Sequence, residues 1–221
     1  MDETADIIII GGGIMGTSTA LHLAEQGVGK VLLLEKSALG AGSSGKSGAI
    51  LRQHYSHEVS VRMARISLQF YESFRTGYGR EIGFRQPGML FVADEAQREA
   101  LERNVELQRS LGVKTQILDA SALREIEPDA QFGDRALGAW EPEAAYVNPA
   151  KTVPGLAAAA QDVGATIRTG VGVDEILQEE GVIQGIRTEA GTRIATDVVV
   201  NTAGPWAGQL LDRLGLDYPL Q

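Results

Sequence analysis

The 221-residue sequence predicts an α/β protein in which a nucleotide-binding βαβ unit opens the chain and an α+β region is inserted before the chain returns to the same sheet. Three observations favour this fold class. A largely apolar, β-branched run over Ala5–Ile10 ends in three glycines, a helical pattern follows it, and a second buried-looking run occurs late in the chain at Asp197–Asn201. Apolar runs of this kind are typical of strands covered on both faces of a parallel sheet.

The first 35 residues have the pattern strand, glycine turn, helix and strand. Ile14–Gln26 carries apolar residues at helical spacing, and Gly27 follows it in the position where glycine commonly ends a helix. Val31–Leu34 is a second short apolar run, which ends at Glu35. Together these segments predict one βαβ unit.

The remainder alternates helical and extended patterns, with no internal repeat and no long linker. We expect helices over 57–76, 95–111 and 149–163, a brief helix capped by Ser121, and a last helix to about Leu214. Strands are expected over 89–93, 115–118, 136–146, 165–168, 173–178, 182–188 and 193–194, with a turn at Glu180–Gly181 between two of them. This order predicts a nucleotide-binding domain in two parts, residues 1–80 and 147–221, with an α+β portion inserted at 81–146.

The composition excludes several classes of function. The chain has no cysteine, which rules out a disulfide scaffold, a thiol nucleophile and cysteine-ligated metal clusters. Twenty basic against 29 acidic residues give a net charge of −9, so nucleic acid is not an expected partner. The run Ile7–Ile10 is far shorter than the roughly 20 residues of a membrane span, and acidic residues precede it where a signal peptide is basic. We expect a cytoplasmic protein without a membrane span.

Gly11, Gly13 and Gly16 form a GxGxxG motif between the first strand and the first helix. The first glycine permits a tight turn, the second lets backbone approach a pyrophosphate, and the third lets helix and strand pack closely. Glu35 ends the second strand, where it can accept both ribose hydroxyls and would repel a 2′-phosphate. A turn that only packs closely is the alternative, but three consecutive glycines cost chain entropy. The motif therefore predicts dinucleotide binding.

Three further segments carry candidate chemistry. The Gly/Ser-rich loop Leu39–Gly48 could present N–H and hydroxyl groups to a ligand, or it could be a flexible surface loop. The segment Arg52–His57 has two histidines three residues apart, but no third ligand is evident, so we expect no metal, and a polar surface turn is an open alternative. Ala203–Trp206 follows the late strand and would bring backbone close to a ligand at the carboxyl edge of the sheet, besides starting a helix.

These segments together resemble the FAD-dependent D-amino-acid oxidase superfamily, and within it the branch of sarcosine oxidase β-subunits, dimethylglycine dehydrogenase and glycine oxidase. The matching residues are Asp6–Gly16, Leu33–Lys36, Gly42–Arg52 and Val198–Trp206. The resemblance implies a Rossmann-like FAD-binding domain with a portion of the substrate domain inserted. It also implies oxidation of a C–N bond of a small N-methylated, secondary or primary amino acid by hydride transfer to the flavin N5.

The resemblance also assigns residues. It implies that Arg52 and Tyr55 lie near the flavin ring as catalytic candidates, with Arg52 the candidate charge that favours the reduced flavin anion. It implies that FAD is bound by Gly11, Gly13, Ile14, Met15, Gly16, Glu35, Lys36, Gly42, Ser43, Ser44, Lys46, Ser47, Gly48, Val173, Ala203, Gly204 and Trp206.

Members of this family continue well past the helix that follows Trp206, so the chain resembles the N-terminal portion of such an enzyme, truncated at the C-terminus. A missing C-terminal segment or a partner chain is therefore expected, beside a small amine or amino-acid substrate. Two alternatives stay open. An NAD-dependent dehydrogenase is compatible with Glu35 but does not explain the Gly/Ser loop or Ala203–Trp206. A non-catalytic nucleotide-binding half-subunit that needs a partner chain is the other.

Overall fold

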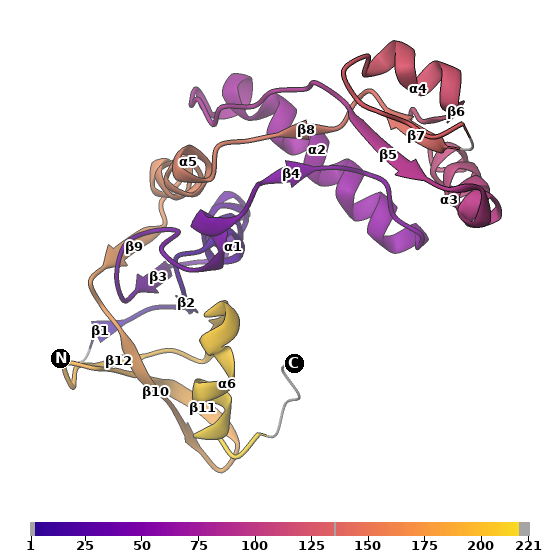
Figure 1. Cartoon of the computed structure of the whole chain (residues 1–221). Helices are drawn as coiled ribbons and strands as arrows, with labels where there is room; N and C mark the ends of the chain where they lie inside the picture. The colour runs from indigo at the N-terminus through magenta and orange to yellow at the C-terminus, as the bar shows by residue number, and fades with distance from the viewer. Residues whose placement is uncertain (1–2, 135, 217–221) are drawn as a thin grey trace. The chain divides into compact units, whose positions relative to one another are not determined.

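The computed structural model describes residues 3–134 and 136–216, which form two compact units (Figure 1). Unit 1 contains the residues up to Ser47 and those from Pro149 onward, and unit 2 is Gly48–Asn148. The first division thus falls well before residue 80, where the sequence analysis placed it, because helix α2 (Glu58–Tyr78) packs within unit 2. The second division, after Asn148, lies two residues from the expected position.

Unit 1 is built on a four-stranded parallel sheet. Its strand order is β13-β2-β3-β9, with bounds Val198–Asn201, Ile7–Ile10, Val31–Glu35 and Thr166–Thr169. The late strand does return to the first sheet, because β13 pairs with β2. It lies at the edge, however, so its side chains are at most partly buried and Val198 is 46% exposed, whereas β2 and β3 occupy the covered centre.

A second sheet covers one face of the parallel sheet. Its order is β1-β12-β11-β10, with bounds Glu3–Thr4, Arg193–Ala195, Val182–Thr188 and Val173–Glu179. Ile8, Ile10, Leu32 and Leu34 of the parallel sheet share a core with Ile176, Ile186 and Ile194 of the second sheet and Leu210 of α6 (Ala207–Asp212). The turn Glu180–Gly181 joins β10 to β11 as expected, with both residues at positive φ.

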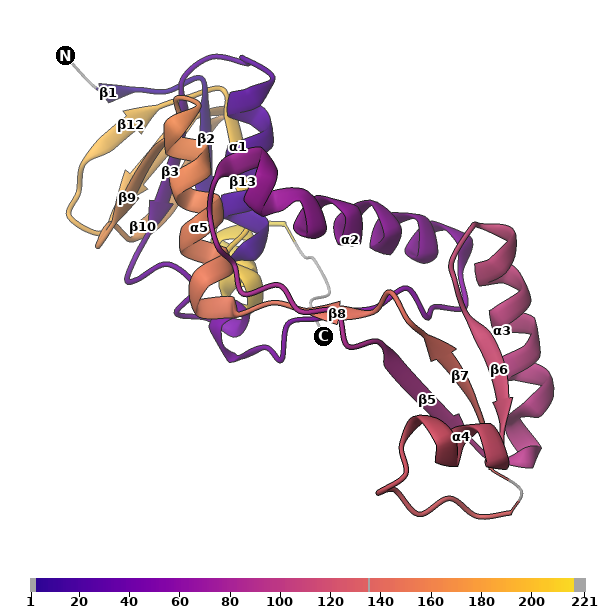
Figure 2. The same ribbon diagram turned by 90° about the horizontal axis from the view of Figure 1, so that it is seen from above.

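Two helices cover the opposite face. Because side chains alternate along a strand, Ile9 and Leu33 point away from the second sheet, and both are fully buried. On this side lie α1 (Ile14–Glu25) and α5 (Pro149–Asp162), which pack against each other. Figure 1 shows the parallel sheet between these helices and the second sheet, and Figure 2 shows the same layers from above. The three layers leave the carboxyl ends of β2 and β3 beside the start of α1.

Unit 2 contains a three-stranded antiparallel sheet in the order β5-β7-β6, with bounds Met89–Ala93, Leu137–Glu141 and Gln116–Asp119. Helix α3 (Arg98–Ser110), which follows the short turn η2 (Glu95–Gln97), packs Leu101 and Val105 on Leu137 and Ala139. Unit 2 also contains a two-stranded ribbon of β4 (Ile50–Leu51) and β8 (Ala145–Tyr146), and Arg85 forms an isolated bridge with Tyr146.

Two local expectations in unit 2 were wrong. The strand expected over 136–146 is divided into β7 and β8, since Pro142 lies in a turn between them. The brief helix α4 (Ala120–Ile126) is capped by Asp119 rather than by Ser121. Asp119 Oδ1 accepts the N–H groups of Ser121 and Ala122 at 3.0 and 2.9 Å, so Ser121 supplies a backbone donor and not the cap. Among the helices that the structure describes, none is both long and apolar enough to cross a bilayer.

Candidate functional site

The glycine turn between β2 and α1 has a geometry that only glycine permits. Gly11 has φ of +110°, and a Cβ there would lie 2.6 Å from the carbonyl oxygen of Thr202. A Cβ on Gly16 would lie 1.9 Å from the carbonyl oxygen of Gly11. These two glycines therefore have the packing roles that the motif predicts: one allows the turn and the other allows the close approach of α1.

The carboxylate of Glu35 is hydrogen-bonded to the glycine turn. Glu35 Oε2 accepts the N–H of Gly12 at 2.7 Å, and Oε1 accepts the N–H and the hydroxyl of Ser37 at 2.8 and 3.1 Å. A carboxylate offers about four acceptor positions, so capacity for a ligand hydroxyl remains. The Glu35 carboxylate thus holds the glycine turn and Ser37 in place, and Glu35 also lines the cavity described below.

The Gly/Ser loop is docked on this turn. The N–H of Gly40 donates to the carbonyl of Gly12 at 2.9 Å. Ser44, in the short helix η1 (Ser43–Lys46), accepts the N–H of Ile14 with its hydroxyl at 3.0 Å. The loop therefore belongs to the same site as the glycine turn, which favours the ligand-facing interpretation over that of a separate surface loop.

The turn, the loop and two later segments of unit 1 enclose a cavity of about 670 Å³, within the range of about 300–1,000 Å³ usual for small-molecule sites. Three of the residues expected at the cofactor do not line it: Gly16 lies behind the turn, Ser47 ends the first segment of unit 1, and Gly48 begins unit 2. The expected residues that do line it are Gly11, Gly13, Ile14, Met15, Glu35, Lys36, Gly42, Ser43, Ser44, Lys46, Val173, Ala203, Gly204 and Trp206.

The cavity wall combines charges of both signs with the end of a helix. Its basic residues are Lys36, Lys46 and Arg213, and its acidic residues are Glu35, Asp174 and Glu189. The first turn of α1 also lines it, and the N-terminus of a helix carries partial positive charge, which no acidic side chain of that turn neutralises. This wall suits a ligand that carries both phosphate and hydroxyl groups.

Trp206 forms an apolar part of the wall. Its ring lies with its centre 4.8 Å from Lys36 Nζ, a cation–π contact, and its edge lies 3.2 Å from the position of a Cβ on Gly42. Pro205 stands in the first turn of η3 (Gly204–Trp206), so the segment starts a helix and lines the cavity at once. Met15, 67% exposed, adds a second apolar surface.

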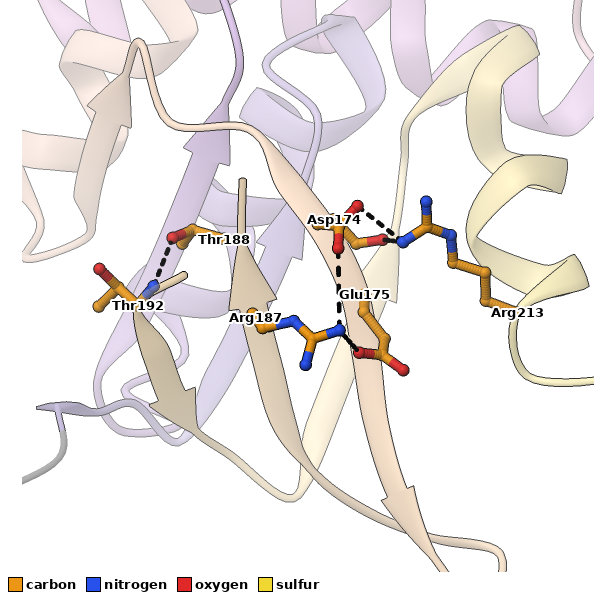
Figure 3. A network of polar contacts seen from close by, with 6 residues as sticks. All are labelled: Asp174, Glu175, Arg187, Thr188, Thr192 and Arg213. Atoms are coloured by element: carbon orange, nitrogen blue, oxygen red, sulfur yellow. Dashed lines mark hydrogen bonds and ion pairs between the residues drawn. The ribbon is translucent and has the colours of Figure 1, made fainter. Parts of the chain in front are cut away.

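Several lining residues were not identified from the sequence: Ser37, Thr202, Asp174, Glu189, Gln209 and Arg213. Thr202 could have been predicted from the sequence, because it lies between the late strand and Ala203. In the structure its hydroxyl donates to the carbonyl of Ile10 at 2.8 Å. Glu189 stands beyond β11, in a turn closed by the N–H of Thr192 donating to the hydroxyl of Thr188 at 3.1 Å (Figure 3). Its place depends on the second sheet, which the motifs do not reveal.

Arg52 and Tyr55 belong to unit 2, where the structure brings them together. The Arg52 guanidinium lies 5.2 Å from the centre of the Tyr55 ring and 5.6 Å from that of Phe91. His54 stacks on Phe91 with ring centres 4.0 Å apart. The segment after β4 is thus an aromatic and cationic cluster, and its exposed guanidinium is available to an anionic group.

A buried carboxyl group holds this segment in place. Glu141 of β7 is fully buried, and its Oε1 accepts the backbone N–H and the side-chain amide of Gln53 at 2.7 and 3.2 Å. Burial raises the pKa of Glu141, opposed by the hydrogen bonds from Gln53 and by the charge of Arg52. Burial lowers the pKa of His54, and the charge of Arg52 lowers it further. In the described part of the chain, no group of three or more acidic or histidine side chains could hold a metal ion.

Comparison with known proteins matches residues 6–221 to the family described as FAD dependent oxidoreductase. The chain is 29% identical over 214 residues to 4-methylaminobutanoate oxidase (formaldehyde-forming) of Paenarthrobacter nicotinovorans, covering 96% of this chain and 26% of that protein. It is 31% identical over 207 residues to the mitochondrial pyruvate dehydrogenase phosphatase regulatory subunit of Mus musculus, covering 93% of this chain and 24% of the relative.

Among solved structures, L-proline dehydrogenase from P. horikoshii has a TM-score of 0.92 and 29% identity, covering 100% of this chain and 58% of the other. The chain therefore spans about a quarter of the length of these curated relatives and somewhat more than half of that solved chain.

Proposed function

The chain belongs to the family of FAD-dependent oxidoreductases, and on that premise we propose that unit 1 binds FAD and that the protein oxidises a C–N bond of a small amino acid. The observation that carries the proposal is the cavity at the glycine turn. It joins a helix N-terminus suited to phosphate, a carboxylate with free acceptor capacity and two apolar side chains. FAD contains a pyrophosphate, ribose hydroxyls and flat rings, so its parts fit this set of groups.

We assign the residues as follows. The backbone at Gly11, Gly13 and Met15 faces the pyrophosphate, since a side chain at Gly11 would meet Thr202 and one at Gly13 would meet Ser44. Glu35 accepts the adenosine ribose hydroxyls, and the start of β10 at Val173 faces the adenine. The remaining FAD contacts are proposed for Ile14, Lys36, Gly42, Ser43, Ser44, Lys46, Ala203, Gly204 and Trp206. Gly16, Ser47 and Gly48 do not line the cavity, and we assign Gly16 the close packing of α1 on the turn instead.

The substrate we propose is a secondary amino acid. Two similar proteins are named for such compounds, 4-methylaminobutanoate and L-proline, each of which joins a secondary amine to a carboxylate. When bound, FAD supplies a hydride acceptor at its N5 atom. Arg52, exposed beside Tyr55, is the candidate cation for the substrate carboxylate or for the reduced flavin. A cytoplasmic location belongs to the same proposal. So does a further segment or partner chain that completes the substrate site, which the greater length of the similar proteins supports.

A second candidate is a regulatory role without catalysis, which the relative named as a regulatory subunit favours. It shares the proposed cofactor site and differs in the outcome with substrate. A flavin that is bound but never bleached by any secondary amino acid, in the chain with its completing segment, would favour this role.

The first test is a calorimetric titration of the chain with FAD and with NAD⁺. We expect FAD to bind at least about tenfold more tightly, a difference of about 1.4 kcal/mol. Gly11→Ala should abolish the binding, because its Cβ has no room. Gly77→Ala is the matched control, since Gly77 lies inside α2 with nothing within 4 Å of its Cβ position. Tighter binding of NAD⁺, or equal FAD binding by Gly11→Ala, would contradict the proposal.

A further inference from the structure

Asp174 interrupts the ladder between β10 and β11 at the wall of the cavity. Val173 pairs with Thr188 and Glu175 pairs with Arg187, so Asp174 is the extra residue of a β-bulge. A bulge of this kind releases a backbone carbonyl from the ladder and redirects a side chain. Both Asp174 and its neighbour Val173 line the cavity.

Arg213 binds both the backbone carbonyl and the side chain of Asp174, the bulge residue. Its Nη1 donates to the backbone carbonyl of Asp174 and to Asp174 Oδ1, each at 2.7 Å. Figure 3 shows Asp174 between two guanidinium groups, those of Arg187 on β11 and Arg213 just after α6. The second is the closer partner, since Arg187 Nη2 stands 3.9 Å from Asp174 Oδ2 and pairs instead with Glu175.

The helix that this contact holds is also attached at its start, where Asn201 Nδ2 donates to the carbonyl of Ala207 at 3.1 Å, but its C-terminal end has few other contacts among the described residues. Helix α6 has six residues, of which Leu210 is the buried one. Beyond it, the carbonyl of Leu214 accepts a longer hydrogen bond from Gln178 Nε2 at 3.4 Å. Gln209, Leu210 and Arg213 line the cavity, so movement of α6 away from β10 would open this wall.

We propose that the Asp174–Arg213 pair is a clasp that holds α6 against β10 and thereby sets how tightly the cavity retains its cofactor. The inference rests on the proposed FAD binding and assigns Arg213 as a positioning residue. Both side chains are partly exposed, at 51% for Arg213 and 36% for Asp174. An exposed pair contributes little to global stability, so the clasp can be broken in a chain that still folds.

The test compares Arg213→Gln with Arg187→Gln. The two arginines are similarly exposed and both pair with acidic residues of β10, but Arg187 does not line the cavity. Flavin fluorescence would follow the dissociation constant and the dissociation rate of FAD. We expect Arg213→Gln to raise the dissociation constant about three- to tenfold, mostly through faster release, and Arg187→Gln to change it less than about twofold.

A second measurement needs no cofactor. Amide hydrogen exchange across residues 207–212 should be faster in Arg213→Gln than in the unmodified chain, and unchanged in Arg187→Gln. Asp174→Asn keeps the backbone carbonyl and should be intermediate. If the unmodified chain binds FAD but the two arginine variants behave alike in both measurements, the Asp174–Arg213 pair does not hold α6 against β10, and the proposed function stands. If the unmodified chain takes up no FAD, both are overturned.

Discussion

The carboxylate of Glu35, at the end of strand β3, accepts a hydrogen bond of 2.7 Å from the backbone N–H of Gly12. The acid and the glycine turn, which the sequence presents as two separated features of one motif, are therefore a single hydrogen-bonded unit. Ser37 adds its N–H and hydroxyl to the same carboxylate. The turn is thus held in shape before any ligand arrives, which lowers the ordering cost of binding.

Glu35→Ala should destabilise the chain even without a cofactor. It leaves the N–H groups of Gly12 and Ser37 without their charged acceptor, which we expect to lower the free energy of unfolding by about 1–3 kcal/mol. Urea denaturation of the cofactor-free chain measures this. Glu106→Ala, at an exposed position of α3, is the control and should stay within about 0.5 kcal/mol. Equal stability of the two variants would refute the structural role of Glu35.

Ser44→Ala should loosen the Gly/Ser loop. The substitution removes the hydroxyl that accepts the N–H of Ile14, so exchange of that amide should become faster, together with amides of the loop. Ser43→Ala is matched in loop, size and chemistry, but no hydrogen bond of its side chain to a described residue is found. Hydrogen exchange followed by mass spectrometry distinguishes the two. Indistinguishable exchange would mean that the loop is held by its backbone contacts alone.

Glu141→Gln should change how stability depends on pH. Burial raises the pKa of Glu141, so the folded state keeps its proton in a pH range where the unfolded state has lost it. The free energy of unfolding is therefore greatest below the ordinary glutamate pKa and falls as the pH rises through the raised value. In Glu141→Gln this fall should disappear, as measured by urea denaturation at a series of pH values.

His54 and Arg52 flank Gln53, the residue whose N–H groups the Glu141 carboxyl accepts, and both are unchanged in Glu141→Gln. The pKa of His54 is lowered, so its contribution has the opposite sign: stability is lost as the pH falls through the lowered value. That acidic slope should persist in Glu141→Gln. A variant with the same decline toward higher pH as the unmodified chain would show that Glu141 is not the group responsible.

Arg52→Gln should separate catalysis from folding. Its guanidinium is exposed, so we expect a change in stability of less than about 0.5 kcal/mol. In the complete protein, amine-dependent bleaching of the flavin should slow by at least about tenfold, with Arg52→Lys intermediate because it keeps the charge without the planar fork. Arg103→Gln, on the exposed face of α3, is the control. Unchanged bleaching in Arg52→Gln would remove Arg52 from the proposed site.

The sequence predicted those parts of the site that depend on local chemistry. Gly11, Gly16 and Glu35 occur at fixed offsets along one βαβ unit, and the structure brings them together as the motif requires. The Asp174–Arg213 contact was not predictable, because it depends on a bulge and on packing between segments 39 residues apart. Asp119 and Ser121 are both cap-forming residues two positions apart, and only the backbone geometry decides between them.

The edge position of β13 has a similar explanation. Its sequence, Val198–Asn201, is as apolar as that of a central strand, but the sheet as described ends there. No further strand of the described sheet therefore covers its outer edge, and its side chains are at most partly buried, with Val198 exposed. An apolar run indicates a strand, whereas its neighbours in the sheet determine how far it is buried.

The most direct test of the account is an absorbance spectrum of the purified chain after incubation with FAD and desalting. The account predicts flavin bands that stay with the protein, and loss of those bands when Gly11→Ala is treated in the same way. A colourless chain, or equal flavin retention by Gly11→Ala, would contradict the claim that the cavity at the glycine turn holds FAD.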